Sequence, residues 1–371
     1  MNCLICNETL TEANASDEHI ILNSLGGHLH SKDLLCKKCN NKFGKEADAA
    51  LADTLKFAAS QLDVKRYRGE NQVIQTSEKE KYDLAPGCKP VLKKPEVRVE
   101  KLPDGKMQIE MSARSTQEAR KILKSLQKQY PMIDVDEAMR HAQKKQSFIG
   151  TPVKMNLVFE GEKIFPSIVK TAVEFYLLRG GAREEIKSLI PHLLGEEKRK
   201  VCWYFYPEKP VFSFEKKEIC HAICVVGDAE QRILYGYVDL FGILQCLVLL
   251  SDCYSGKNYM ESYVYDVNEG KEISKTPVIR LERDEIQKIV RGTEASWVDG
   301  VLRQTRLFHE KAGEIVKERV LDGMWQRIMD QSLGKYPEGV LITEEMLGEV
   351  LAEMKKEMIP WYVSRICGTD L

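Results

Sequence analysis

The chain alternates between segments in which apolar residues recur with helical spacing and segments with the two-residue period of strands. The clearest helical face follows residue 42, where apolar side chains recur at steps of three or four residues. Its members are Phe43, Ala47, Leu51, Leu55, Ala58 and Leu62. Residues 1–71 are therefore predicted to form one compact module that ends in a helix. The pattern then gives way to polar and proline-containing sequence, which predicts a linker over 72–95.

Residues 96–150 predict a basic β-hairpin followed by a helix. Two alternating segments, 97–99 and 107–111, flank the turn tripeptide Pro103-Asp104-Gly105, and alternation on both sides of a turn is typical of a hairpin. A helix is expected over about 115–129. Lysine and arginine outnumber acidic residues across this segment, so it offers a basic surface.

The rest of the chain predicts an α+β domain over 151–281 and a mainly helical region over 282–371, interrupted near 334–337. The α+β domain is expected to contain strands over 153–159, 201–206, 219–226, 233–240, 244–250 and 262–267, with helices over 164–179 and 183–194. The fold class is therefore α+β.

The most apolar stretch, 233–250, raises the question of a membrane span. It contains Asp239 and Gln245 and is interrupted by two glycines, whereas a spanning helix needs about 20 uninterrupted apolar residues. Buried sheet is the better interpretation. The N-terminus lacks a basic region followed by an apolar core, which argues against a secretory signal. We expect a cytoplasmic protein with no membrane partner.

The overall charge excludes a general attraction to nucleic acid. The 55 lysines and arginines nearly cancel the 56 aspartates and glutamates. Hydrophobic residues make up 43% and charged residues 30% of the 371 residues, the balance of a globular protein rather than a disordered one. Any binding to DNA must therefore come from local patches.

Four of the 11 cysteines form two Cys-x-x-Cys pairs near the N-terminus, Cys3/Cys6 and Cys36/Cys39. Two such pairs can supply four thiolates to one tetrahedral Zn²⁺, which would be structural because no coordination position stays open. Two unrelated pairs, or a redox pair, are the alternatives. The other seven are expected to have no special role, and several lie in apolar strand-like segments, where a free cysteine behaves as a small hydrophobe. The seven are Cys88, Cys202, Cys220, Cys224, Cys246, Cys253 and Cys367.

A second group of residues suggests hydrolytic chemistry. Glu18 and His19 are adjacent between the cysteine pairs, and Asn40 follows the second pair at the start of a helix. Carboxylate and amide oxygens suit Mg²⁺ or Mn²⁺, and a histidine outside the metal shell can deprotonate water. This is the equipment for metal-assisted phosphodiester hydrolysis. The alternative is a simple zinc ribbon in which His19 is a packed or surface histidine.

These motifs together resemble the HNH endonuclease family. Cys-Leu-Ile-Cys, Glu-His-Ile-Ile, Leu-Gly-Gly and Cys-Lys-Lys-Cys-Asn stand in the family's order over residues 3–44, as in its zinc-containing branch. The resemblance implies a ββα-metal finger in which His19 is the general base. It further implies that Glu18 is the acidic metal ligand and that Asn40 completes the catalytic metal site. Ser31 stands where many members have Asn, a residue that usually orients the histidine, and Asp33 is the nearest comparable residue.

Basic residues around the motif are candidates for gripping a phosphodiester backbone. One group surrounds the second cysteine pair and one follows the module's helix. The predicted contacts are Lys32, Lys37, Lys38, Lys42, Lys45, Lys65, Arg66 and Arg68. Phosphate contacts carry no sequence information, so no recognition sequence is predicted.

The sequence thus predicts a Mg²⁺- or Mn²⁺-dependent DNA endonuclease with a structural zinc. By resemblance it would serve in bacterial host defence, with the C-terminal region as sensor, as binding site for a defence partner, or as a homodimer interface. The alternative from another class is a non-catalytic zinc-ribbon module that binds DNA or protein. RNA as the substrate ranks lower, because no RNA-reading signature is present.

Overall fold

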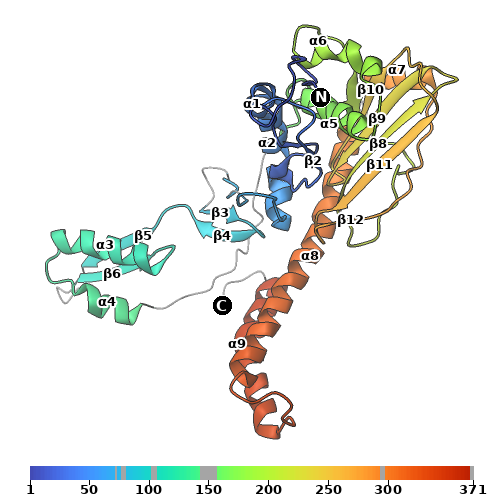
Figure 1. Cartoon of the computed structure of the whole chain (residues 1–371). Coiled ribbons are helices and arrows are strands. Elements are labelled where there is room, and N and C mark those ends of the chain that lie inside the picture. The colour runs from blue at the N-terminus through green and yellow to red at the C-terminus, as the bar shows by residue number, and fades with distance from the viewer. Residues whose placement is uncertain (72, 77–80, 102–106, 143–156, 293–296, 368–371) are drawn as a thin grey trace. The chain divides into compact units, whose positions relative to one another are not determined.

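The computed structural model describes all residues except 72, 77–80, 102–106, 143–156, 293–296 and 368–371 (Figure 1). The chain divides into two compact units. One comprises Met1–Gln72 with Leu157–Val316, and the other Val73–Asn156 with Lys317–Leu371. The N-terminal module and most of the α+β region therefore belong to one unit, although 84 residues, 73–156, separate them in the sequence.

The N-terminal module contains a short antiparallel strand pair followed by two helices. The strand β1 (Glu18–His19) pairs with β2 (His30–Ser31), and α1 (Lys37–Lys45) and α2 (Ala47–Leu62) follow. The predicted helical face is divided between these helices, because the backbone leaves the helical region at Glu46, with φ −114° and ψ −91°. The face is nevertheless buried as expected from its spacing.

The connection between β1 and β2 depends on two glycines. Gly26 has φ +85° and ends the 3-10 helix η1 (Asn23–Leu25), a conformation that disfavours a side chain. A Cβ on Gly27 would lie 1.9 Å from the carbonyl oxygen of Ile21. The Leu-Gly-Gly motif is thus required by sterics.

Gly27→Ala is expected to destabilise the unit by more than about 3 kcal/mol, since the new methyl group meets backbone rather than a movable side chain. Gly44→Ala is the matched control, because a Cβ on this α1 residue would have no neighbour within 4 Å. It should be neutral or stabilise by about 1 kcal/mol, as alanine favours helix. Urea unfolding of both variants measures the difference; equal stability would contradict the steric argument.

A six-stranded antiparallel sheet forms the centre of the first unit, in the order β12-β11-β8-β9-β10-β7. Its strands are β7 (Cys202–Tyr204), β8 (Cys220–Asp228), β9 (Ile233–Leu240), β10 (Leu244–Ser251), β11 (Tyr259–Asp266) and β12 (Lys271–Glu272). The apolar stretch 233–250 forms the adjacent strands β9 and β10, whose residues are buried throughout. No helix in the described part of the chain is long and apolar enough to cross a membrane.

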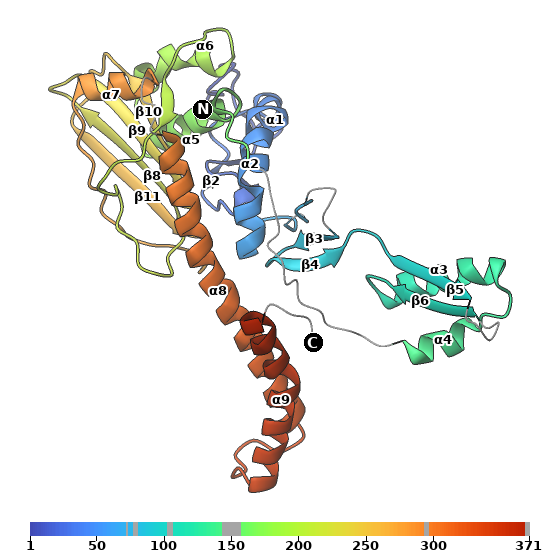
Figure 2. The ribbon, with the colours of Figure 1, turned by 180° about the vertical axis from the view of Figure 1, so that it is seen from behind.

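Helix α5 (Gly161–Leu178) lies between this sheet and the N-terminal module (Figures 1 and 2). Nearly every residue from Ile164 to Tyr176 is buried, as expected for a helix covered on both sides. The remaining helical elements of the unit are η2 (Arg183–Leu189), α6 (Ile190–Leu193), α7 (Arg283–Val290) and the first part of α8 (Trp297–Leu333). The mixture of sheet and helices confirms the α+β class.

Polar contacts join the module to the rest of its unit. The Arg183 guanidinium donates to the carbonyl oxygens of Asn2, Cys3 and Leu4, at 2.9, 2.6 and 2.9 Å. Thr171 Oγ1 donates to the Ile20 carbonyl oxygen at 2.9 Å. These bonds satisfy backbone carbonyls of the module with side chains from 157–316, which fixes its position on α5.

His221 of β8 makes a further bond of this kind. Its Nε2 donates to the Leu25 carbonyl oxygen at 2.8 Å, and the ring packs edge-on against Phe241. The neighbouring Cys220 and Cys224 belong to the apolar core. Burial lowers the pKa of His221 to about 4.

The buried His221 predicts an acid-sensitive stability. Below pH 6.5 the unfolded chain takes up a proton that the folded chain resists until about pH 4, so stability falls as the pH falls through this window. The loss is on the order of 3 kcal/mol. Burial raises the pKa of Asp239 to about 7, which acts in the opposite direction. The measurement is therefore the difference in unfolding free energy between the unmodified chain and His221→Gln, taken at pH 7 and pH 4. A difference independent of pH would contradict the assignment.

The second unit contains two small hairpins and several helices. These are β3 (Tyr82–Ala85), β4 (Lys89–Leu92), β5 (Glu96–Lys101), β6 (Met107–Ser112), α3 (Thr116–Gln129), α4 (Val135–His141), the end of α8, and α9 (Glu344–Cys367). The predicted basic hairpin is observed as β5 and β6, with Val99 opposite Ile109. The predicted interruption near 334–337 separates α8 from α9.

Two sequence predictions differ from the structure. The segment predicted as a linker contains the β3–β4 pair, because Pro86-Gly87 serves as its turn, with Gly87 at φ +75°. Of the strand predicted over 153–159, residues 153–156 lie outside the described residues and 157–159 are not in a strand.

Candidate functional site

The four N-terminal cysteines converge on one point. Their sulfur atoms all lie within 4.8 Å of one another, and the Cys6 and Cys36 sulfurs are 3.7 Å apart. A tetrahedral ion with Zn–S bonds of about 2.3 Å requires sulfur–sulfur distances of about 3.8 Å. The geometry therefore fits a four-coordinate metal ion such as zinc.

Local structure brings the two pairs together. Cys36 is the N-cap of α1 and Cys39 lies in its first turn, while the Cys36 amide donates to the Cys3 sulfur at 3.4 Å. Arg183 holds the carbonyl of Cys3 from outside the module. The site is thus built by the module and braced by the α+β region.

Glu18 and His19 lie on opposite sides of the module, because successive side chains of a strand alternate. Glu18 faces α5 and is 2% exposed, and His19 faces His30, its antiparallel partner on β2. The two residues predicted as metal ligand and base therefore have different surroundings.

The Glu18 carboxylate is paired with a buried lysine. Lys170 Nζ, on α5, lies 2.7 Å from Glu18 Oε1 and 2.7 Å from Asp48 Oδ2 on α2. Lys170 is fully buried. Ser167 Oγ donates to the other oxygen of Asp48 at 2.6 Å, so α5 binds both carboxylates from one face.

A third acid lies one helical turn beyond the lysine. Glu174 is fully buried, and neither of its carboxylate oxygens has a hydrogen-bond partner among the described residues. Burial and the charge of Glu18 raise the pKa of Glu174 well above its usual value. Burial alone would lower the pKa of Lys170, but Glu174, Glu18 and Asp48 outweigh it and raise that pKa. We refer to Glu18, Asp48, Lys170 and Glu174 as the buried ion cluster.

Asn40 adjoins this cluster. Its Nδ2 donates to Ser16 Oγ at 2.7 Å. Burial raises the pKa of Glu18, while Lys170 and Asn40 oppose the rise. The structure therefore places the Asn40 side chain near the Glu18 carboxyl group. Their oxygen donors suit a hard cation, but the ammonium group of Lys170 already occupies the Glu18 carboxylate, so this arrangement does not accommodate a divalent ion.

His19 belongs to a cluster of rings on the other side of β1. Its ring stacks on His30 at 5.4 Å between centroids and meets Tyr67 edge-on at 5.3 Å. His30 Nδ1 lies 2.7 Å from Asp17 Oδ1. Although His19 is only 6% exposed, its Nε2 has no hydrogen-bond partner in the described part of the chain.

The surroundings of His19 favour its neutral form. Burial lowers the pKa of His19, and the neighbouring His30 and Arg68 lower it further against the opposing charge of Asp17. A neutral imidazole with an unengaged nitrogen can accept a proton from water. Tyr67 is exposed, so this side of the module borders solvent.

The predicted phosphate contacts are mostly exposed. Lys32, Lys37, Lys38, Lys42, Lys45, Lys65 and Arg68 have exposed side chains, and Arg66 is half-buried. Arg68 acts electrostatically on His19. Two of the α1 lysines are engaged with backbone, Lys37 with the Ala13 carbonyl oxygen at 2.8 Å and Lys42 with that of Leu194 at 3.3 Å.

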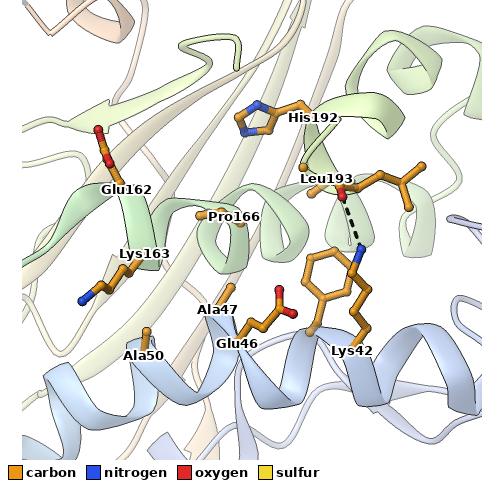
Figure 3. Close-up of a pocket in the computed structure, with 12 residues that line it drawn as sticks. Lys42, Glu46, Ala47, Ala50, Glu162, Lys163, Pro166, His192 and Leu193 are labelled. Atoms are coloured by element: carbon orange, nitrogen blue, oxygen red, sulfur yellow. Dashed lines mark hydrogen bonds between the residues drawn. The ribbon is translucent and has the colours of Figure 1, made fainter. Parts of the chain in front are cut away.

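A pocket of about 370 Å³ lies between α1 and α2 on one side and α5 and α6 on the other (Figure 3). Of the residues predicted from the sequence as catalytic, metal-binding or phosphate-binding, only Lys42 lines this pocket. His192, Glu46 and Pro166 also line it. The pocket is therefore distinct from the rings around His19.

Sequence reasoning did not single out Lys170. A signal was available, because Lys170 and Glu174 are the two charged residues, four apart, in the otherwise uncharged stretch 164–178. Such residues are rarely buried unless paired. The sequence could not identify Glu18 and Asp48 as the partners.

Residues 3–56 match a protein-family model described as HNH endonuclease. The remainder of the chain is not covered by that model. No curated protein and no solved structure matches the chain. The family supports a nuclease with DNA as substrate, and the matched segment contains the complete cysteine cluster.

Proposed function

Because residues 3–56 match the HNH endonuclease family, we propose that the chain is a DNA endonuclease that hydrolyses phosphodiester bonds. The observation that supports this most directly is His19, which is buried, favoured in its neutral form, and free at Nε2 among the described residues. A general base needs these properties to take a proton from the attacking water.

In this proposal β1, β2 and α1 form a ββα-metal finger with Zn²⁺ at Cys3, Cys6, Cys36 and Cys39. The zinc is structural, because four thiolates leave no coordination position for a substrate. Its contribution is to hold the start of α1 against the first cysteine turn, which keeps Asn40 beside Glu18.

Glu18 and Asn40 would hold a catalytic Mg²⁺ or Mn²⁺ once the Glu18 carboxylate is released from Lys170 and turns to the side of β1 that carries His19. Such an ion would supply stabilisation of negative charge on the departing oxygen. The protein's own part would be to hold the scissile phosphate against the rings of His19, His30 and Tyr67, on the side of the module that borders solvent. Arg68, beside His19, and the exposed lysines of α1 supply positive charge for the DNA backbone.

The proposal extends to the C-terminal region, which lies outside the segment that matches the HNH family. A role as a sensor in bacterial host defence, with a defence partner, or as a homodimer interface, is what the family resemblance suggests. Exposed apolar side chains of α9, including Leu347, Leu351 and Tyr362, would suit a protein interface.

The second candidate is a non-catalytic zinc module that binds DNA or protein. The pairing of Glu18 with Lys170 favours it, as does Ser31 at the position where many HNH proteins carry Asn. A binding module would retain zinc and affinity for DNA but would not cleave it with any divalent ion.

The test is incubation of the purified full chain with supercoiled plasmid and Mg²⁺ or Mn²⁺. Relaxed or linear product, absent in EDTA, supports the endonuclease and tells nicking from double-strand cutting. Plasmid that is retarded on a gel but left supercoiled by both the unmodified chain and Lys170→Met supports the binding module. A single-stranded RNA substrate in parallel tests the lower-ranked alternative.

A further inference from the structure

We propose that Lys170 is an internal cation which takes the place of the catalytic divalent ion and keeps the nuclease site closed to metal. This inference rests on the proposed function, because it concerns the same carboxylate, Glu18. It adds a control element supplied by the α+β region, outside the segment that matches the HNH family.

The first argument is the position of the ammonium group. Lys170 Nζ is 2.7 Å from Glu18 Oε1, a direct charge-assisted contact. The aromatic ring of Phe43 covers the ammonium group at 5.4 Å from its centroid. The ammonium group thus contacts Glu18, one of the two residues proposed as metal ligands, and lies over the Phe43 ring.

The second argument is exclusion by charge. A divalent ion on Glu18 would lie within a few ångströms of a positive charge that is fully removed from water, where repulsion is only weakly screened. Metal and ammonium group therefore compete for one place.

The third argument is that the cluster needs some cation. Glu18, Asp48 and Glu174 surround a single lysine, and both oxygens of Glu174 lack a partner among the described residues. Burying carboxylates is costly unless they are paired. An incoming divalent ion would supply more positive charge than the lysine it replaces. The buried carboxylates would therefore still be neutralised after the exchange.

The fourth argument is mechanical. Ser167, Lys170 and Thr171 of α5 bind Asp48, Glu18 and the Ile20 carbonyl of the module. The opposite side of this helix packs on the sheet. Withdrawal of Lys170 requires α5 to shift on the module, so a ligand or partner acting on the α+β region could control metal entry.

The experiment measures Mn²⁺ binding to the zinc-loaded full chain by electron paramagnetic resonance of free Mn²⁺. Lys170→Met removes the charge and retains an unbranched apolar side chain. We expect it to lower the Kd for Mn²⁺ at least tenfold. Lys163→Met is the matched control, since this lysine lies on the same helix with 67% of its side chain exposed, and it should bind Mn²⁺ like the unmodified chain.

Adding Glu18→Gln to Lys170→Met should abolish the gain, which locates the ion at Glu18. An equal Kd for Lys170→Met and the unmodified chain would overturn the proposal. If Lys170→Met does not fold, the unmodified chain is compared with Glu18→Gln. If Lys170 keeps the site closed, the unmodified chain and Glu18→Gln should bind Mn²⁺ with the same Kd. Tighter Mn²⁺ binding by the unmodified chain than by Glu18→Gln would refute the proposal.

Plasmid cleavage by the same samples separates this inference from the proposed function. Tighter Mn²⁺ binding by Lys170→Met without cleavage would uphold the cation exchange and contradict the nuclease. Equal cleavage and equal Mn²⁺ binding by both proteins would uphold the nuclease and contradict the exchange.

Discussion

Replacing His19 with alanine should lower the rate of plasmid cleavage by about 10²–10⁴-fold, the usual contribution of a general base. The imidazole is the only proton acceptor we propose at the site, and its Nε2 is free among the described residues. Fold and zinc content should be unchanged, because no described polar contact of the module depends on that nitrogen. The rate is measured as loss of supercoiled plasmid under single-turnover conditions, with Mn²⁺ at saturation. If the unmodified chain does not cleave because Lys170 keeps the site closed, the cleavage rate of Lys170→Met is compared with that of the double variant His19→Ala/Lys170→Met.

His141→Ala is the matched control, because this histidine is exposed on α4 in the second unit. It should cleave at the unmodified rate. Cleavage by His19→Ala at that same rate would rule out the proposed base. Loss of cleavage together with loss of zinc would indicate damage to the fold rather than to the chemistry.

Replacing Cys39 with serine should remove the zinc and unfold the N-terminal module. The apparent free energy of zinc binding at four-ligand sites is about 10–16 kcal/mol, as large as the stability of a whole domain, about 5–15 kcal/mol. Cys39 is buried at the start of α1, so its loss also releases the helix that carries Asn40. The measurements are metal content by mass spectrometry and amide hydrogen exchange over residues 1–72.

Cys253→Ser is the control for this substitution, since Cys253 is an exposed free thiol. It should keep one zinc per chain and full protection of the module. A Cys39→Ser protein that is zinc-free, folded and active would show that the four-cysteine cluster has no structural role.

The elements of the fold were largely predictable because their signals are local. The apolar runs over 233–240 and 244–250 became β9 and β10. The predicted helix after the basic hairpin is α3, whose N-cap Ser115 accepts a bond from the Glu118 amide. The linker prediction failed at β3 and β4 for a related reason, since a proline–glycine turn inside a hairpin looks the same in sequence as a flexible connection.

The cysteine cluster was predictable for another reason. Two tight turns with two cysteines each can present four sulfurs to one ion with little dependence on the rest of the fold. The spacing of the cysteines within each pair therefore determines most of the geometry of the metal site. The sulfur atoms do converge within 4.8 Å.

The sequence by itself determined most of the helices and strands, the convergence of the cysteines, and the residue types available at the candidate site. Only the tertiary structure decided that Glu18 faces Lys170 while His19 faces His30. Lys170 and Glu18 are 152 residues apart, and their contact depends on how α5 packs between sheet and module. Hydrophobic periodicity predicts which side of a helix or strand is buried, but not which charged residue from a distant part of the sequence contacts that side. That pairing is a property of the assembled core.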